Sequence, residues 1–164
     1  MSAAFVALGA NLAGRHASPA EAVEAGIRAI DSPSLRVTAR SRLYRSVAWP
    51  DPDDPEFVNA VVALETGLSP GELLTRLHEI EAAFGRVRRE MNAPRPLDLD
   101  IIDYDGMVSA SGEAPVLPHP RLAERAFVLQ PLAEVAPDWR HPMTHMPIAE
   151  LIAVLADSGS ASPL

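Results

Sequence analysis

The spacing of hydrophobic and polar residues along the chain predicts a series of strands and helices. Apolar runs typical of strands occupy residues 4–8 and 57–66, and residues 35–44 alternate apolar with polar side chains, as a half-buried strand does. Helical spacing of apolar residues marks 19–31 and 70–85, and a Ser-Pro-x-Glu capping signature opens each of these two segments. The first part of the chain is therefore expected to mix strands with helices.

A further strand, near residue 100, carries carboxylates inside an apolar run. Leu97, Leu99 and Ile101 share one parity, and Asp98 and Asp100 share the other. Because a strand has a period of two, the leucine side can face a core while both carboxylates point to the opposite face. Their Cα atoms would lie about 6.6 Å apart, two rises of a strand. Like charges that close repel, so the aspartate face is expected either to be open to water or to hold cations.

These elements follow the order β-α-β-β-α-β over residues 4–103, which is the ferredoxin-like pattern of an α+β protein with helices packed on an antiparallel sheet. Short elements are expected after this core: a C-terminal hairpin turning at Asp105-Gly106, and helices near residues 127–135 and 147–156. We expect one domain over residues 1–164, with 157–164 as a frayed tail. The proline-rich stretch 46–55 is expected to be an exposed loop, and Trp49 within it suggests a lid.

Composition narrows the class of protein and of partner. The chain carries 22 acidic and 14 basic residues, a formal net charge of −8, and has no cysteine. Phosphate-rich surfaces favour basic proteins, so we expect neither a nucleic-acid nor a membrane partner. The N-terminus lacks the basic region of a signal peptide, and no apolar run reaches the roughly 18 residues of a membrane span. The sequence predicts a cytoplasmic protein, without disulfides or thiolate metal sites.

All 14 basic residues are arginine, and four of them, Arg86, Arg88, Arg89 and Arg95, lie within residues 86–95, just before the paired aspartates. Carboxylates on a strand can bind Mg²⁺ together with phosphate oxygens, and guanidinium groups neutralise phosphate charge. Together these residues favour transfer of a phosphate chain, and the absence of a G-x-x-x-x-G-K-[ST] motif excludes a P-loop enzyme. Taken separately, the aspartates also fit an acidic strand face exposed to water. The arginines also fit a solvated helix C-terminus, where cations suit the helix dipole.

Several single residues are further candidates for function. Asn59 lies between apolar residues of a strand, where its amide needs a defined partner. His119 lies between two prolines, and His78 and Glu81 are neighbours on a helix surface; each fits a structural or solvated role as well as a functional one. Phe57 and Phe127 are most simply core residues.

Longer stretches resemble a known family. The run "RVRREMNAPRPLDLDIID" is similar to the signature of the 6-hydroxymethyl-7,8-dihydropterin pyrophosphokinases, and "LGANL", "LYRS", "FVNAVVALET" and "LPHPRLAERAFVLQPL" match the same family in the same order. The resemblance spans about residues 4–137. It implies transfer of pyrophosphate from ATP to the pterin hydroxymethyl group, releasing AMP, in folate biosynthesis. It also implies direct attack by the substrate hydroxyl, without a covalent intermediate, and we expect a monomer.

The resemblance also assigns roles to individual residues. Two Mg²⁺ ions would be held by Asp98 and Asp100. The positions that match ATP and phosphate contacts are His78, Glu81, Arg86, Arg88, Arg95, His119 and Arg125; of these, Arg86, Arg88 and Arg95 are expected to be catalytic together with the aspartates. The positions that match pterin contacts are Ser46, Val47, Ala48, Phe57, Asn59 and Phe127.

The sequence departs from the family pattern at a few positions. Phe57 stands where tyrosine is frequent, Asn92 where tryptophan is frequent, and His78 where glutamine is common. None of these departures affects the aspartate pair or the main arginines, so activity is expected. Two other classes stay open at this point: a nucleotide or metabolite sensor on a ferredoxin-like domain, and a metal-dependent nuclease, which the acidic charge opposes.

Overall fold

The computed structural model describes residues 1–11, 16–47, 53, 56–85, 96–155 and 161–164. Its strands are β1 (Ser2–Ala10), β2 (Leu35–Arg40), β3 (Tyr44–Ser46), β4 (Phe57–Thr66), β5 (Asp98–Tyr104) and β6 (Ala161–Pro163). Its helices are α1 (Pro19–Ile30), α2 (Pro70–Ala83), the short 3-10 turn η1 (Leu122–Glu124), α3 (Ala126–Val135) and α4 (Ile148–Val154). Within this described part of the chain, no helix is long and apolar enough to cross a membrane.

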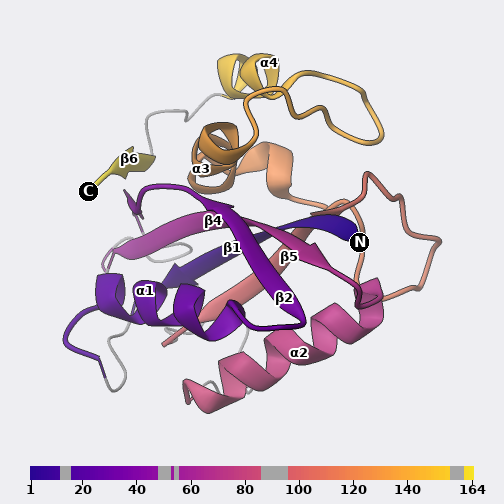
Figure 1. The fold of residues 1–164 in the computed structure, drawn as a ribbon. Coiled ribbons are helices and arrows are strands. Elements are labelled where there is room, and N and C mark those ends of the chain that lie inside the picture. Colours follow the sequence, from indigo (N-terminus) through magenta and orange to yellow (C-terminus); the bar gives the residue numbers. More distant parts are fainter. Residues whose placement is uncertain (12–15, 48–52, 54–55, 86–95, 156–160) are drawn as a thin grey trace.

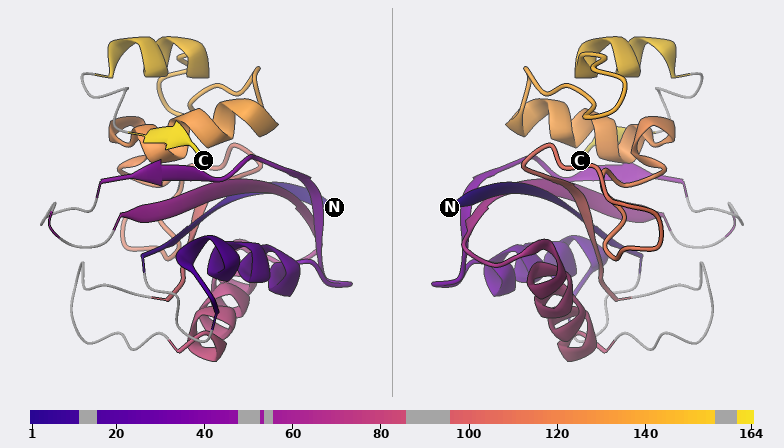
Figure 2. Two further views of the ribbon diagram at one scale, coloured as in Figure 1. Left: turned by 90° about the vertical axis from the view of Figure 1, so that its left-hand side faces the viewer. Right: turned by 90° about the vertical axis from the view of Figure 1, so that its right-hand side faces the viewer.

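The strands build one antiparallel sheet with a layer of helices on each face. The described strands form a six-stranded sheet in the order β5-β1-β4-β3-β6, and β2 pairs with the other half of the β4 edge that β3 uses. Helices α1 and α2 cover one face, and α3 and α4 lie on the other (Figures 1 and 2). This arrangement confirms the ferredoxin-like α+β fold that the element order predicts.

The first helical layer forms where the capping signatures predict it. Ser18 and Ser69 accept hydrogen bonds from the N–H groups of Glu21 and Glu72, both at 3.2 Å, and a proline follows each serine. At α2 the Glu72 carboxylate accepts in return from the Ser69 N–H at 3.0 Å, which completes a capping box. The apolar faces of both helices close over one side of the sheet. The core there includes Leu8, Ile30, Leu64, Leu73, Leu77, Leu97 and Leu99.

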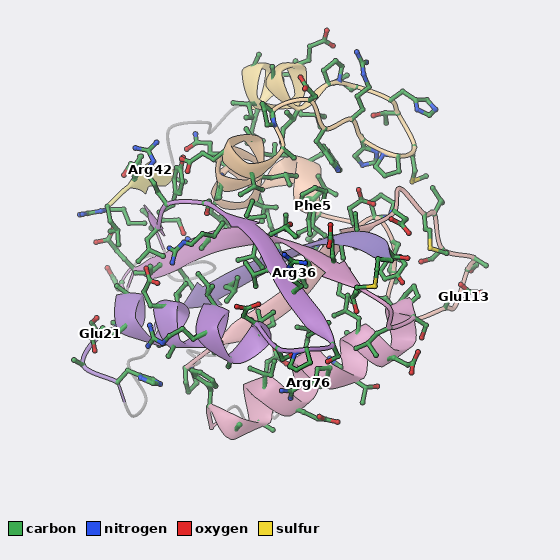
Figure 3. All side chains as sticks on the ribbon, in the orientation of Figure 1. Phe5, Glu21, Arg36, Arg42, Arg76 and Glu113 are labelled. Atoms are coloured by element: carbon green, nitrogen blue, oxygen red, sulfur yellow. The ribbon has the colours of Figure 1, made fainter. Side chains whose placement is uncertain are left out.

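The second layer adds a core of its own and a buried polar anchor. Phe5 lies between the sheet and α3 (Figure 3), packed against a cluster that contains Leu129 and Leu132. The Trp139 indole N–H donates to the Asp103 carboxylate at 2.9 Å, and the Gly106 N–H donates to its other oxygen at 3.0 Å. A β-bulge at Ile101–Asp103 turns Asp103 toward this layer, so the segment between α3 and α4 is tied to the sheet.

The strand predicted over residues 35–44 is two strands in the structure. Ser41 lies between β2 and β3, and its hydroxyl accepts the Val61 N–H at 3.0 Å while it donates to the Arg42 carbonyl at 2.7 Å. A side-chain oxygen thus replaces a backbone acceptor of the ladder, and the strand is interrupted there. The outward positions of Arg36, Arg40 and Arg42 agree with the prediction, since all three are exposed.

Two expectations for the C-terminal half are wrong. The turn at Asp105-Gly106 forms, with φ of 52° and 69°, but residues 107–110 do not form the returning strand. The Ile102 carbonyl, on the outer edge of β5, accepts instead from the N–H of His119 at 3.0 Å, so a later segment takes that edge. The tail is also more ordered than expected, because Ala161–Pro163 pairs with β3; residues 156–160 lie outside the described part.

Candidate active site

The aspartates lie on β5 as the alternation predicts. Leu97, Leu99 and Ile101 are 0%, 2% and 4% exposed and belong to the core beneath α1 and α2. Asp98 and Asp100 are half-buried and point to the opposite face, where their partners across the strand pair are Gly9 and Ala7 of β1. One rigid strand therefore anchors the core and holds two carboxylates side by side.

A row of residues runs from Asp98 across the sheet. Asp98 lies opposite Gly9, Gly9 opposite Asn59, and Asn59 opposite Tyr44, and directly opposite residues in antiparallel strands share a face. A Cβ at Gly9 would stand 3.2 Å from the Asn59 Oδ1 atom and 3.9 Å from a Phe57 ring carbon. Because Gly9 has no side chain, the sheet face between Asp98 and Asn59 stays uncovered at this position.

The far end of this row carries polar and aromatic side chains. Asn59 and Ser46 are both 4% exposed, and the Asn59 amide donates to the Ser46 hydroxyl at 2.8 Å. Phe57 shares this face with them, and Val47, the next residue after β3, is 56% exposed. Phe127 lies in the first turn of α3, which contacts β3, β4 and β6. The structure thus brings four predicted pterin contacts to one end of the sheet face.

His119 stands beside the aspartate strand in its neutral form. Its Nδ1 atom accepts the Arg121 N–H at 3.1 Å, which leaves the imidazole proton on Nε2 as a donor. The pKa of His119 is lowered to about 4, chiefly by burial and also by the charge of Arg125, while the charge of Asp98 opposes the shift. Arg125 itself lies over the Phe127 ring, 5.5 Å from its centroid. His119 and Arg125 therefore connect the aspartates with the aromatic end of the site.

The two predicted ATP contacts on α2 have different environments. His78 is exposed, whereas Glu81 is 1% exposed, and its carboxylate accepts the Leu99 N–H at 2.8 Å. Leu99 lies between the two aspartates, so Glu81 holds the backbone of the strand that carries them. Its spacing from His78 suggests a solvated helix surface, and only the contact with β5 shows that Glu81 is buried.

Other parts of the prediction are not described by the structure. Arg86, Arg88, Arg95 and Ala48 lie outside the described residues. One contact of this region was missed from the sequence: the Tyr44 hydroxyl donates to the Glu134 carboxylate, which also accepts from the Arg42 guanidinium at 3.0 Å. These partners are about 90 residues apart, and no local pattern connects them. The contact fastens the last turn of α3 to β3.

The site combines paired carboxylates on a strand with a neutral histidine and an arginine beside it. A polar and aromatic surface lies on the same sheet face. On a ferredoxin-like fold, this combination suits a nucleotide-dependent transferase. Residues 5–137 match the model of the family described as 7,8-dihydro-6-hydroxymethylpterin-pyrophosphokinase (HPPK). The chain belongs to this family.

Relatives agree with this assignment, and a solved structure shares the fold. The chain is 46% identical over 138 residues to a 2-amino-4-hydroxy-6-hydroxymethyldihydropteridine pyrophosphokinase of Methylorubrum extorquens, covering 84% of this chain and 85% of that one. It is 43% identical over 157 residues to the enzyme of the same name from Pseudomonas aeruginosa, covering 94% and 93%. The fold is also similar to a Plasmodium falciparum HPPK-DHPS structure, with a TM-score of 0.72 at 12% identity, over 99% of this chain and 47% of that longer one.

The activity follows from the family. The chain is a pyrophosphokinase of folate biosynthesis, which transfers pyrophosphate from ATP to the hydroxymethyl group of 6-hydroxymethyl-7,8-dihydropterin. ATP is its co-substrate.

Proposed function

We propose that Asp98 and Asp100 bind two Mg²⁺ ions together with the triphosphate of ATP. The observation that carries this proposal is the common orientation of the two half-buried carboxylates on β5. Among the described residues, no group of three or more acidic, histidine or cysteine side chains could hold a metal. Phosphate oxygens and water are the ligands that Mg²⁺ commonly takes beside one or two carboxylates. Hard oxygen donors of this kind suit Mg²⁺, which when bound neutralises charge on the phosphates.

On this proposal the pterin lies at the far end of the row, on the surface formed by Ser46, Phe57, Asn59 and Phe127, hereafter the pterin face. The Asn59 amide is oriented by the Ser46 hydroxyl, and an oriented amide can read the polar edge of a heterocycle. The two phenylalanine rings supply stacking surface. Val47 and Ala48 would border the ligand on the side of the loop that follows β3.

His119 and Arg125 would bind the phosphates between these two ends. His119 keeps an Nε2 proton to donate to an oxygen, and because its pKa is about 4 it stays neutral at pH 7. We propose Arg86, Arg88 and Arg95 as further triphosphate ligands, Arg86, Arg88, Arg95, Asp98 and Asp100 as the catalytic set, and His78 and Glu81 as residues on the ATP side.

Transfer then needs position and charge neutralisation rather than a nucleophilic side chain. The pterin hydroxyl oxygen forms a bond to the β-phosphorus of ATP and releases its proton to water. The bond from that phosphorus to the oxygen shared with the α-phosphate breaks, and AMP leaves with that oxygen. The carboxylates sit on a rigid strand, and the pterin face sits on the same sheet, so the two reactants are held by one framework.

Product analysis after mixing the protein with ATP, Mg²⁺ and 6-hydroxymethyl-7,8-dihydropterin tests this proposal. AMP and a pterin diphosphate should form in equal amounts, whereas ADP would indicate transfer of a single phosphoryl group. Asp98→Ala should lose transfer while keeping a normal urea-unfolding midpoint, and normal turnover in that variant would refute the metal site. We further propose that the protein acts as a cytoplasmic monomer without nucleic acid, consistent with its net charge of −8; light scattering tests the monomer.

A further inference from the structure

Strand β6 forms the border of the sheet next to the pterin face. It pairs with β3 in the register Tyr44↔Pro163, Arg45↔Ser162 and Ser46↔Ala161. The Leu164 N–H donates to the Leu43 carbonyl at 3.0 Å, which extends the pairing beyond the strand. Strand β3 has only three residues. It pairs with Phe57–Asn59 of β4 on one edge and with β6 on the other, so both neighbours hold it in place.

The Ala161 side chain connects β3 with the start of α3. Ala161 is 5% exposed and forms a buried cluster with Tyr44 and Ala126, against which Phe127 packs. Its register places it directly beside Ser46 on the same face. Figure 2 shows β6 lying along α3 on this side of the sheet. Ala161 therefore lies in contact range of β3 and α3, two of the three elements that carry the pterin face.

The first turn of α3 depends on this packing more than an ordinary helix start does. Its N-cap residue, Arg125, makes no side-chain capping bond. Pro131 lies four residues after Phe127 and has no N–H to donate to the Phe127 carbonyl. The other end of the helix is fastened through Glu134 to Arg42 and to Tyr44, the same tyrosine that packs with Ala161 (Arg42 is labelled in Figure 3). Phe127 packs against the Ala161 cluster and also against the larger cluster that contains Leu129, so packing at the N-terminal end contributes to its position.

We propose that Ala161 is a positioning residue for the pterin: it keeps β3 and the first turn of α3 at the spacing that the pterin ring requires. The inference rests on the proposed pterin face. The proposal predicts different effects on the two substrates, because β6 and the aspartate strand β5 lie at opposite ends of the strand order. A change at Ala161 should therefore alter pterin affinity and leave ATP affinity unaltered.

The test compares Ala161→Leu with Ser162→Leu in the full chain. Ser162 is the next residue of β6 and is exposed, so it receives the same side chain without filling the cluster. Binding of 6-hydroxymethylpterin is measured by its fluorescence in the presence of Mg²⁺ and α,β-methylene-ATP, and binding of that analogue is measured by calorimetry. Ala161→Leu should raise the Kd for the pterin at least tenfold and change the Kd for the analogue less than twofold; Ser162→Leu should change neither by more than twofold.

The outcome against the proposal is equally definite. Pterin binding within twofold of wild type in Ala161→Leu, or an equal loss of pterin and nucleotide affinity, would overturn it. If Ala161→Leu does not fold, Ala161→Val fills less space and should still raise the pterin Kd at least threefold. Asn59→Ala tests the pterin face itself. If Asn59→Ala binds the pterin as wild type does while Ala161→Leu binds it more weakly, the proposed pterin site is rejected. If only Asn59→Ala loses pterin affinity, only the role of Ala161 is rejected.

Discussion

Removing the Glu81 carboxylate should loosen the strand that holds Asp98 and Asp100. Glu81 is 1% exposed and accepts the Leu99 N–H at 2.8 Å. In Glu81→Leu this N–H loses its acceptor in a buried place, which costs about 1–3 kcal/mol of the free energy of unfolding. For a chain of this size, that loss lowers the Tm by roughly 2–12 °C.

Glu81→Gln is the matched comparison. The glutamine keeps an oxygen that can accept from Leu99, but the bond is then between neutral groups and about half as strong. Both substitutions remove the negative charge, so the difference in stability between them isolates the acceptor. The Leu variant should be less stable than the Gln variant, and it should need more Mg²⁺ for half-maximal rate, because its carboxylate strand is less firmly held.

Urea unfolding and amide hydrogen exchange provide the measurements. The Leu99 amide should exchange faster in Glu81→Leu than in wild type or Glu81→Gln. The amides of α1 should exchange faster only to the extent that the free energy of global unfolding falls. Glu79→Leu is the control, since Glu79 is an exposed neighbour on α2 and its loss should alter stability by no more than about 0.5 kcal/mol. Equal stability of the Leu and Gln variants, with a Leu99 amide that exchanges as slowly as in wild type, would refute this account.

Three further predictions concern other parts of the site. Gly9→Val puts a side chain where a Cβ alone would stand 3.2 Å from the Asn59 Oδ1 atom, so the KM for the pterin should rise about tenfold or more, as for a misplaced contact. An unchanged KM would show that the space above Gly9 is not used by the substrate. The pKa of His119 is lowered, chiefly by burial, from its ordinary 6.5 to about 4. Between these two pH values the unfolded chain binds a proton at this residue and the folded chain does not. The free energy of unfolding should therefore fall as the pH falls from 6.5 to about 4. An NMR titration midpoint near 6.5 would contradict this, and His119→Asn should reduce the slope. Tyr44→Phe removes a hydrogen bond to Glu134 and should cost about 0.5–1.5 kcal/mol, measured by urea unfolding; an unchanged midpoint would mean that Arg42 alone fastens α3 to β3.

Local patterns in the sequence were sufficient for most of the elements and for the orientation of the aspartate strand β5. The alternation around Asp98 and Asp100 places the leucines in the core, because a one-residue shift would bury both charges. Serine caps and the prolines after them fix the starts of α1 and α2 for reasons that lie within one turn of helix. Strand β4 was predicted at its observed bounds, Phe57–Thr66, because its apolar run ends at turn residues on both sides.

What could not be predicted depends on partners that are distant in sequence. Ser41 interrupts a well-patterned strand only because its hydroxyl meets the Val61 N–H. Glu81 looks like a surface residue until β5 is placed beside α2. Ala161 belongs to a small, polar stretch of the kind that usually frays. It is ordered because it pairs with the edge of β3 and packs against Ala126 of α3. In each case a tertiary contact overrides the local signal.

The contacts along β5 also bear on how the protein behaves at high concentration. β5 is an outer strand of the sheet, and an outer strand with bare N–H and C=O groups can pair with another molecule. Here the Glu81 carboxylate occupies the Leu99 N–H, and the His119 N–H occupies the Ile102 carbonyl. The contacts that fix the two carboxylates thus also protect the strand from edge-to-edge aggregation, so a substitution that frees β5 would endanger solubility along with catalysis.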